Sequence, residues 1–208
     1  LFTGSSVTGG IVNSGAINGG SYGIGLNAST LTGGIVNSGT ISNGVSRGIY
    51  LVSGSSTDSI TNQAGGTISG SFAGIDIVGS IVTGGISNGG AINGFSYGVG
   101  VAGGTVTGGI VNSGTITGGR GIALVNGSIV DDINNAGGTI SAAVGIHLAT
   151  GSSVTGGIVN SGLITAATGI RLSSASSAGS ISNSGIITAS SNGSAGIRLS
   201  SGSTVGSV

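Results

Sequence analysis

A segment of about twelve residues recurs along the whole chain and constrains its fold more than any other feature. Its clearest copy is Val-Thr-Gly-Gly-Ile-Val-Asn-Ser-Gly-Thr-Ile-Thr at residues 106–117. The isoleucine before each asparagine marks the copies, which are Ile11, Ile35, Ile60, Ile86, Ile110, Ile133, Ile158 and Ile181. Neighbouring copies lie 24, 25, 26, 24, 23, 25 and 23 residues apart. A period of this length predicts an array of small stacked units.

Apolar residues inside each repeat follow the period of a β-strand. Two further columns come after the marker isoleucine, and one precedes it by four residues. They are Ile17, Ile41, Ile68, Ile92, Ile116, Ile140, Ile164 and Ile187; then pairs such as Ile24/Leu26 and Ile146/Leu148; and Val7, Leu31, Val82, Val106, Ile129 and Val154. Spacings of two or four residues indicate strands with one buried face, and the Gly, Ser and Asn clusters between them indicate turns. We expect three short strands and three turns per repeat.

One repeat carries too few inward aliphatic side chains to offset the entropy of ordering its backbone, so repeats must stack on one another. The sequence therefore predicts an all-β fold, a right-handed parallel β-helix (β-solenoid) with three strands per coil of about 24 residues and about eight coils. We expect residues 1–208 to form a single continuous array. Because both ends interrupt a repeat, we expect that array to be a fragment of a longer one.

An asparagine follows each marker isoleucine at a distance of two residues, on the same face of the strand. These residues are Asn13, Asn37, Asn62, Asn88, Asn112, Asn135, Asn160 and Asn183. A buried amide must be hydrogen-bonded, and in stacked coils each asparagine can bond to the one above and the one below. The sequence predicts an inward asparagine ladder with a structural role.

The composition excludes several classes of protein. A charged fraction of 4% with no lysine lacks the basic footprint of nucleic-acid binding, so we expect no nucleic-acid partner. A mean hydropathy of +0.54 is too high for a disordered glycine-rich chain. No apolar run reaches the length of a membrane helix. A net charge of zero favours self-association, either lateral or end to end.

The motif Gly-Gly-Ile-Val-Asn-Ser-Gly-Thr-Ile resembles the passenger repeats of bacterial autotransporters and related large surface adhesins, and the resemblance covers essentially the whole chain. Those passengers are right-handed β-helices at the cell surface. The resemblance implies an extracellular or bacterial cell-surface location. It concerns a structural repeat and not an activity, because members of this class differ in function.

The few ionisable residues do not form a recognisable reaction centre. Asp58, Asp131 and Asp132 fall at turns, Asp76 falls on the outer face of a strand, and His147 is expected to be a surface histidine. No phosphate-binding loop or calcium-binding repeat is present in the sequence. We expect no catalytic residues, no cofactor, no metal and no enzymatic activity.

The unusual side chains collect along one side of the predicted solenoid. All four arginines, the histidine and four of the six aromatic residues occupy two outward positions of the last strand of each repeat. The predicted contact stripe consists of Tyr22, Arg47, Phe72, Tyr97 and Arg120, with Phe72 assigned to the position before the glycine that opens this strand. Stacked aromatic and arginine side chains can form cation–π contacts. Such a stripe serves either local stacking or contact with a neighbouring filament or a host or matrix glycan.

Together these features predict a structural extracellular β-solenoid that forms a filament, fibre or adhesin stalk. Two other functions stay open. An ice-binding solenoid is suggested by Thr115-x-Thr117 and similar pairs, although Leu163 and Ile186 interrupt those rows. A carbohydrate-active β-helix enzyme is the other alternative.

Overall fold

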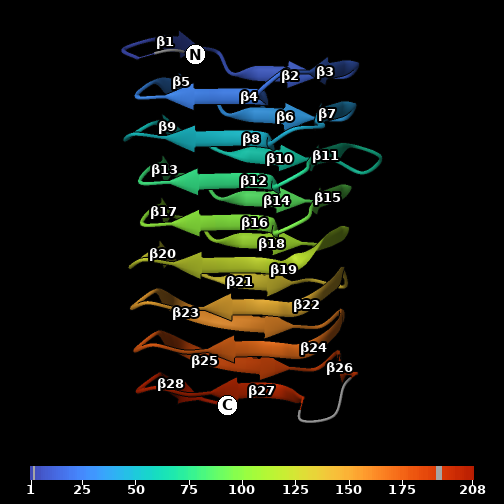
Figure 1. The fold of residues 1–208 in the computed structure, drawn as a ribbon, viewed down its shortest axis with the longest axis vertical. Helices are drawn as coiled ribbons and strands as arrows, with labels where there is room; N and C mark the ends of the chain where they lie inside the picture. Colours follow the sequence, from blue (N-terminus) through green and yellow to red (C-terminus); the bar gives the residue numbers. More distant parts are fainter. Residues whose placement is uncertain (2, 191–193) are drawn as a thin grey trace.

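The computed structural model describes residues 1, 3–190 and 194–208, and these residues form one stack of parallel coils (Figure 1). No described residue is helical. Every strand pairs in parallel with the equivalent strand of the next coil, as Ile60–Asn62 does with Ile35–Asn37 on one side and Ile86–Asn88 on the other. The structure confirms the predicted parallel β-solenoid of about eight coils.

Each early coil contains four strand segments. The first column comprises β1 (Ser6–Thr8), β5 (Thr30–Thr32), β9 (Ser56–Thr57), β13 (Ile81–Val82), β17 (Thr105–Val106) and β20 (Ile129–Val130). The second comprises β2 (Ile11–Asn13), β6 (Ile35–Asn37), β10 (Ile60–Asn62), β14 (Ile86–Asn88), β18 (Ile110–Asn112) and β21 (Ile133–Asn135). The third comprises β3 (Ala16–Asn18), β7 (Thr40–Asn43), β11 (Thr67–Gly70) and β15 (Ala91–Gly94), and the fourth β4 (Tyr22–Asn27), β8 (Arg47–Val52), β12 (Ala73–Val78) and β16 (Tyr97–Ala102).

Segments merge in the later coils. β23 (Ser153–Asn160) and β25 (Ser177–Asn183) join the first two columns, and β28 (Thr204–Ser207) continues the first. β19 (Thr115–Val125), β22 (Thr139–Leu148) and β24 (Leu163–Leu172) join the last two columns, which separate again as β26 (Ile186–Ala189) and β27 (Ala195–Leu199). The described strands thus form two continuous parallel sheets.

The division into four segments differs from the three strands expected per repeat. In the coils that carry it, the glycine pair before the marker isoleucine bends the chain, whereas Asp58-Ser59 and Asp131-Asp132 interrupt the strands in two other coils. Gly33 and Gly34 have φ angles of 91° and 73°, which bend the chain between β5 and β6. Gly156 and Gly157 lack this left-handed conformation, and there β23 runs through with only a shift of register. The apolar column four residues before the marker therefore forms short strands of its own.

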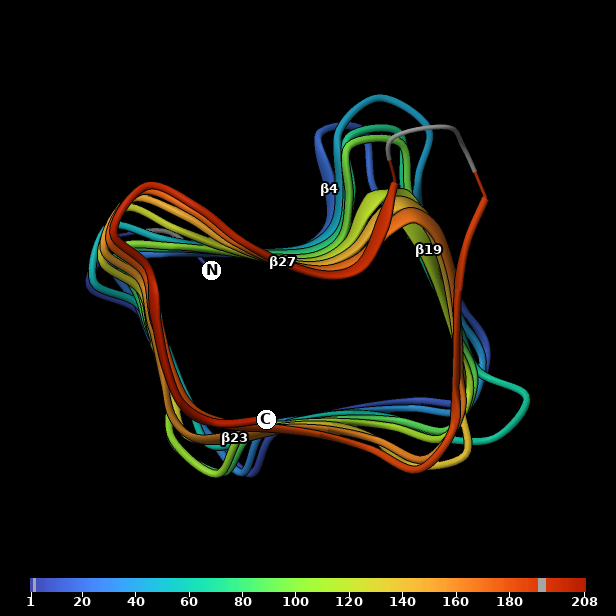
Figure 2. The ribbon, with the colours of Figure 1, turned by 90° about the horizontal axis from the view of Figure 1, so that it is seen from below.

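The solenoid is right-handed. The fourth-column strands run leftward across the front of Figure 1, and the second-column strands run rightward behind them. Seen from below in Figure 2, with the C-terminal coils nearest the viewer, the chain therefore turns counter-clockwise as it approaches. This is the handedness expected for parallel strands joined by crossover connections.

Aliphatic side chains fill the interior of the stack. The marker isoleucines from Ile35 to Ile181 are buried, as are the pairs of the fourth strand from Ile24/Leu26 to Ile170/Leu172. One expected position is wrong: Ile129 is 45% exposed, and its neighbour Val130 points inward at 0%. At the ends, where no further coil covers the core, Ile11, Ile187 and Ile197 are only partly buried.

The asparagine ladder is present. In each step the side-chain Nδ2 of one asparagine donates to Oδ1 of the asparagine in the next coil at 2.7–2.8 Å, from Asn13 through to Asn183. The same Nδ2 also donates to backbone carbonyls, as Asn62 does to Gly66 and Ala91 at 3.1 Å each. Asn183, on the last complete step, is exposed. The ladder satisfies the buried side-chain amide of every coil that is followed by another coil.

A second polar ladder, of serines, escaped the sequence analysis. Its members lie two residues before the first-column apolar residue, and they are Ser29, Ser55, Ser80, Ser128, Ser152 and Ser176, all buried. Each hydroxyl donates to a carbonyl two or three residues earlier, at 2.6–2.9 Å. Some also accept from the preceding coil, as Ser152 does from the amide of Ser128 at 3.2 Å. Each serine lies two residues before an inward-facing residue, and this spacing could have predicted that the serines also face inward.

Candidate functional site: an aromatic and basic face

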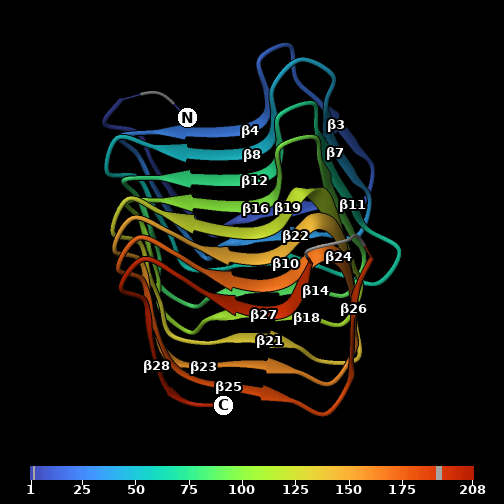
Figure 3. The ribbon, with the colours of Figure 1, turned by 60° about the horizontal axis from the view of Figure 1, so that its bottom comes forward.

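The outer face of the fourth-column strands carries the unusual side chains. In register, one outward column reads Tyr22, Arg47, Ala73, Tyr97, Arg120, Val144, Thr168 and Ala195. The next outward column reads Gly25, Tyr50, Asp76, Gly100, Ala123, His147, Arg171 and Arg198. The connections that lead into these strands project outward in the first four coils and flatten in the later ones (Figures 2 and 3). They form a wall beside the first half of the face.

The position assigned to Phe72 needs correction. The residue before the glycine that opens this strand is Ala73, not Phe72. Ala73 therefore occupies the register position, and it is fully buried. Phe72 instead lies in the connection before β12. Its ring still reaches the face, because Arg47 Cζ lies 4.5 Å from its centroid.

The predicted stripe residues touch one another in a continuous chain. The rings of Tyr22 and Tyr50 lie 4.8 Å apart, and Arg47 lies over Tyr50 at 4.4 Å. Phe72 meets Tyr97 edge to face at 5.3 Å. Arg120 then lies over Tyr97 at 5.6 Å. Tyr50, which was not included in the stripe, supplies the link between Tyr22 and Arg47.

An ion pair links the second and third coils on this face. Arg47 Nε donates to Asp76 Oδ2 at 2.6 Å, and the Asp76 side chain is 6% exposed. Asp76 points outward, as expected, but its neighbours cover it. Burial raises the pKa of the Asp76 carboxyl, and the hydrogen bond and charge of Arg47 only partly offset that rise. Burial also raises the pKa of Tyr50.

His147 is not the surface histidine that the sequence suggested, because only 7% of it is exposed. Its Nε2 lies 3.3 Å from Ser173 Oγ, and its Nδ1 is buried with no hydrogen-bond partner. Burial, followed by the charges of Arg120 and Arg171, lowers the pKa of the imidazole to about 4. The ring is therefore neutral at physiological pH.

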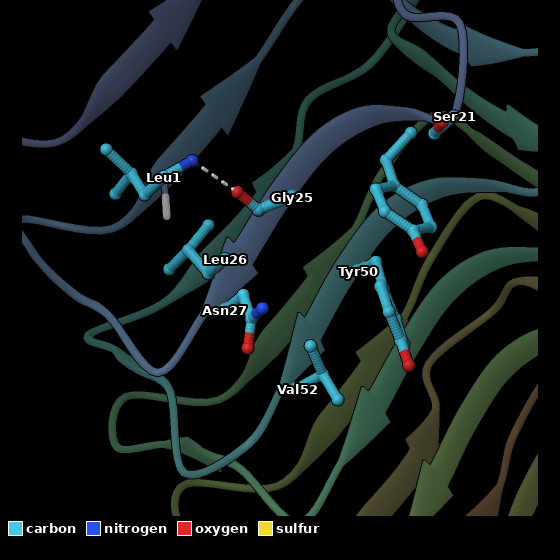
Figure 4. Close-up of a pocket in the computed structure, with 8 residues that line it drawn as sticks. Leu1, Ser21, Gly25, Leu26, Asn27, Tyr50 and Val52 are labelled. Atoms are coloured by element: carbon cyan, nitrogen blue, oxygen red, sulfur yellow. Dashed lines mark hydrogen bonds between the residues drawn. The ribbon is translucent and has the colours of Figure 1, made fainter. Parts of the chain in front are cut away.

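Two hollows open on the face. The first, of about 380 Å³, lies at the N-terminal end, where Leu1, Gly25 and Tyr50 line it (Figure 4) and Tyr22 lies beside Tyr50. There the terminal amino group of Leu1 donates to the Gly25 carbonyl at 2.6 Å. The second, of about 220 Å³, has Phe72 and Tyr97 on its rim and the small residues Gly100 and Ala123 at its base. Small residues in the outer column produce both hollows.

The remaining acids serve the backbone at another corner of the coil. Asp58 accepts from the amide of Gly33 at 2.7 Å, Asp131 from Gly108 at 3.0 Å, and Asp132 from Gly157 at 2.7 Å. Each carboxylate thus holds the turn of a neighbouring coil. Within the described ranges no group of three or more His, Cys, Asp and Glu side chains is arranged to hold a metal ion.

Comparison with family models, with curated proteins and with solved structures finds no match to this chain. A search of the described residues for a helix long and apolar enough to cross a membrane finds none. The function is therefore inferred from the arrangement of side chains on the solenoid. It offers a rigid rod with one chemically distinct face.

Proposed function

We propose that this chain is a structural segment of an extracellular filament, fibre or adhesin stalk, at or beyond a bacterial cell surface. The observation that carries the proposal is the continuous register. Both sheets and the asparagine ladder pass through every coil without a break, from Asn13 to Asn183. A stack of this kind forms a long and stiff rod, because each coil is held by hydrogen bonds to the coils above and below it.

The use of the acidic side chains supports a scaffold over an enzyme. Asp76 is paired with Arg47, and Asp58, Asp131 and Asp132 hold backbone amides of adjacent coils. General acid–base catalysis needs a titratable group within reach of a substrate. Here the carboxylates are engaged in contacts that stabilise the stack. The proposed scaffold is not an enzyme and uses no cofactor.

The end coils are shaped to receive a further coil along the axis. Ile187, Ile197 and Val205 are only partly covered at one end, and Ile11 and Ile17 at the other. The strands of these coils also present an unpaired edge, which is a template for another parallel strand. A further coil, from a second copy or from a longer chain, buries both. The extracellular location rests on the resemblance of the repeat motif to surface passengers.

The threonine rows give less support to ice binding. Thr117 donates its hydroxyl to Asn93 Oδ1 at 2.8 Å, so this row bonds to itself. Ile186, exposed to 62%, interrupts the neighbouring row. A thermal-hysteresis assay distinguishes this function, and a reducing-end release assay on polysaccharides distinguishes a carbohydrate-active enzyme.

Electron microscopy combined with light scattering tests the proposal. We expect short rods whose mean length and mass increase with protein concentration. Replacing the end residue Ile197 with Lys should shorten the assemblies, because the charge opposes burial of the open coil. Thr165→Lys, on the outside of β24, is the matched control and should assemble normally. Rods that stay single at all concentrations, or variants that assemble alike, contradict assembly along the axis.

A further inference from the structure

The charges of this chain are separated in space. Arg47 is neutralised by Asp76 at 2.6 Å, whereas in the described residues Arg120, Arg171 and Arg198 have no carboxylate within ion-pair distance. The other acids lie in turns at a different corner of the coil. A neutral molecule thus carries three uncompensated guanidinium groups on one face.

These arginines follow one another along the axis. Arg120 belongs to the fifth coil, His147 to the sixth, Arg171 to the seventh and Arg198 to the eighth. Arg171 and Arg198 are direct register partners, one strand spacing of about 4.8 Å apart. Like charges opposite each other on adjacent strands destabilise a sheet. An anion bound between them would remove that cost.

The arginine side chains are also incompletely satisfied. Nε of Arg120 and Nε of Arg171 are buried without an acceptor. Buried donors without partners are rare in folded proteins and ask for an explanation, of which an absent ligand or ion is one. The partial burial of both guanidinium groups strengthens their attraction for an anion, because charges are less screened away from water.

The basic file continues into the second hollow. Ala123 at the base of the hollow is the register partner of His147, and Arg120 lies over Tyr97 on its rim. Phe72 and Tyr97 present aromatic surface next to these cations. Aromatic rings pack against the apolar faces of sugar rings, and guanidinium groups bind carboxylates and sulfates in two-pronged fashion.

We propose that this face binds a linear acidic polysaccharide that lies along the solenoid axis. Its carboxylate or sulfate groups contact Arg120, Arg171 and Arg198, and a sugar ring occupies the second hollow, which Phe72 and Tyr97 help to line. An extended sugar chain that runs along the axis passes the fifth, seventh and eighth coils, which carry these arginines. Arg120 lies in one outward column and Arg171 and Arg198 in the other, so the three cations can meet the acidic groups of one polymer strand. The inference adds a ligand class to the proposed scaffold and depends on the scaffold only for the spacing of the groups.

Binding to polygalacturonate, an unbranched chain of uronic acids, tests the proposal by calorimetry at several salt concentrations. We expect binding that weakens as salt rises and no binding to neutral dextran. The double variant Arg171→Gln/Arg198→Gln should bind at least tenfold more weakly. Arg120→Gln alone, in a central coil, should also weaken binding. Circular dichroism and electron microscopy of the variants report separately on the scaffold.

A charge-restoring variant supplies the control. Adding Val111→Lys and Val159→Lys to the double variant restores the net charge on the second-column strands, the opposite side of the coil (Figure 2). We expect no recovery of binding. Recovery, unchanged affinity of the double variant, or absence of binding by the natural chain would each overturn the proposal. Tighter binding of single-stranded polythymidylate than of polygalacturonate would overturn the saccharide class.

Discussion

At the scale of single residues, the buried amide column decides which coils can stack. Asn112 illustrates its role, because Nδ2 donates to Asn135 Oδ1 at 2.8 Å while Oδ1 accepts from Asn88 at 2.8 Å. Its removal takes the ladder donor from Asn135 Oδ1 and the ladder acceptor from Asn88 Nδ2, which keeps only its backbone carbonyl acceptors. A buried polar group without a hydrogen bond costs about 1–3 kcal/mol.

We therefore expect Asn112→Ala to lower the free energy of unfolding by about 2–4 kcal/mol, since two groups lose a partner. Urea denaturation followed by circular dichroism measures the change. Asn183→Ala is the matched control, because Asn183 ends the column and is exposed. It should cost clearly less. Equal losses of unfolding free energy at both positions would show that a buried ladder asparagine contributes no more to stability than the exposed one.

Thr57 is a local defect in the first apolar column. It lies between Leu31 and Val82 in register, and its Oγ1 is buried without a partner. Thr57→Val keeps the shape and removes the hydroxyl, so we expect a gain of about 1 kcal/mol or more in unfolding free energy. A thermal melt of the variant checks the direction. A loss of stability would mean that the hydroxyl is satisfied in solution.

His147 makes the stability of the fold depend on pH. The folded state lowers the pKa from 6.5 to about 4, so the unfolded chain binds a proton more readily between these values. Stability is complete above about pH 6.5 and falls as pH drops toward 4, by up to about 3 kcal/mol from this group. The groups that face the ring are Arg120, Arg171 and Ser173.

Proton NMR of the imidazole, together with denaturation of His147→Gln, isolates this effect from the aspartates. The ring should titrate near pH 4, and the variant should lose less stability than the natural chain between pH 7 and pH 4. A ring that titrates near pH 6.5 would show that it is open to water.

The sequence could assign some side chains to the interior or the surface, but not others. The isoleucine and asparagine columns were readable because a spacing of two residues fixes a common face. Ile129 and Val130 are adjacent aliphatics, so composition alone could not decide which points inward. His147 contacts Ser173 of the next coil, and no local sequence pattern predicts the burial of its ring.

At the scale of the strand, a glycine opens each fourth-column segment and allows the coils to approach. A Cβ at Gly121 would lie 2.6 Å from the Gly145 carbonyl oxygen and would also collide with Ile140 Cγ2. The same holds at Gly23, Gly48, Gly74, Gly98, Gly145 and Gly169. Only backbone fits at this corner.

Gly121→Ala should accordingly destabilise the fold by about 1–3 kcal/mol, the usual cost of overpacking. Gly196→Ala tests the same repeat position in the last coil, where the nearest atom to a Cβ is Ile187 Cγ2 at 3.8 Å. It should be nearly neutral. Parallel urea titrations compare the two, and a neutral Gly121→Ala would show that the coils separate easily.

Strand number was harder to predict than strand existence. The bend between β5 and β6 depends on the φ angles of Gly33 and Gly34, whereas Gly156 and Gly157, in the same sequence context, leave β23 continuous. Identical residues adopt different conformations here. The sequence therefore located the turns without showing which of them interrupt pairing.

At the scale of the whole molecule, continuous register accounts for both the rod and its distinct face. Each coil repeats the path of the one before, so outward side chains from distant parts of the chain form files along the axis. The aromatic chain from Tyr22 to Tyr97 and the basic file from Arg120 to Arg198 arise in this way. The sequence indicated the side on which they gather, but their contacts required the stacked coils.

Distances between spin labels test this stacking most directly. The chain has no cysteine, so labels can be placed at Ala16, Thr115 and Ile186, which share one outward register position and are exposed. Ala16 and Thr115 are four coils apart, and Ala16 and Ile186 are seven coils apart. Electron paramagnetic resonance should give narrow distributions near about 19 Å and about 34 Å, a rise of about 4.8 Å per coil. Broad distributions, or a separation that does not grow with the number of coils, would contradict the stacked solenoid.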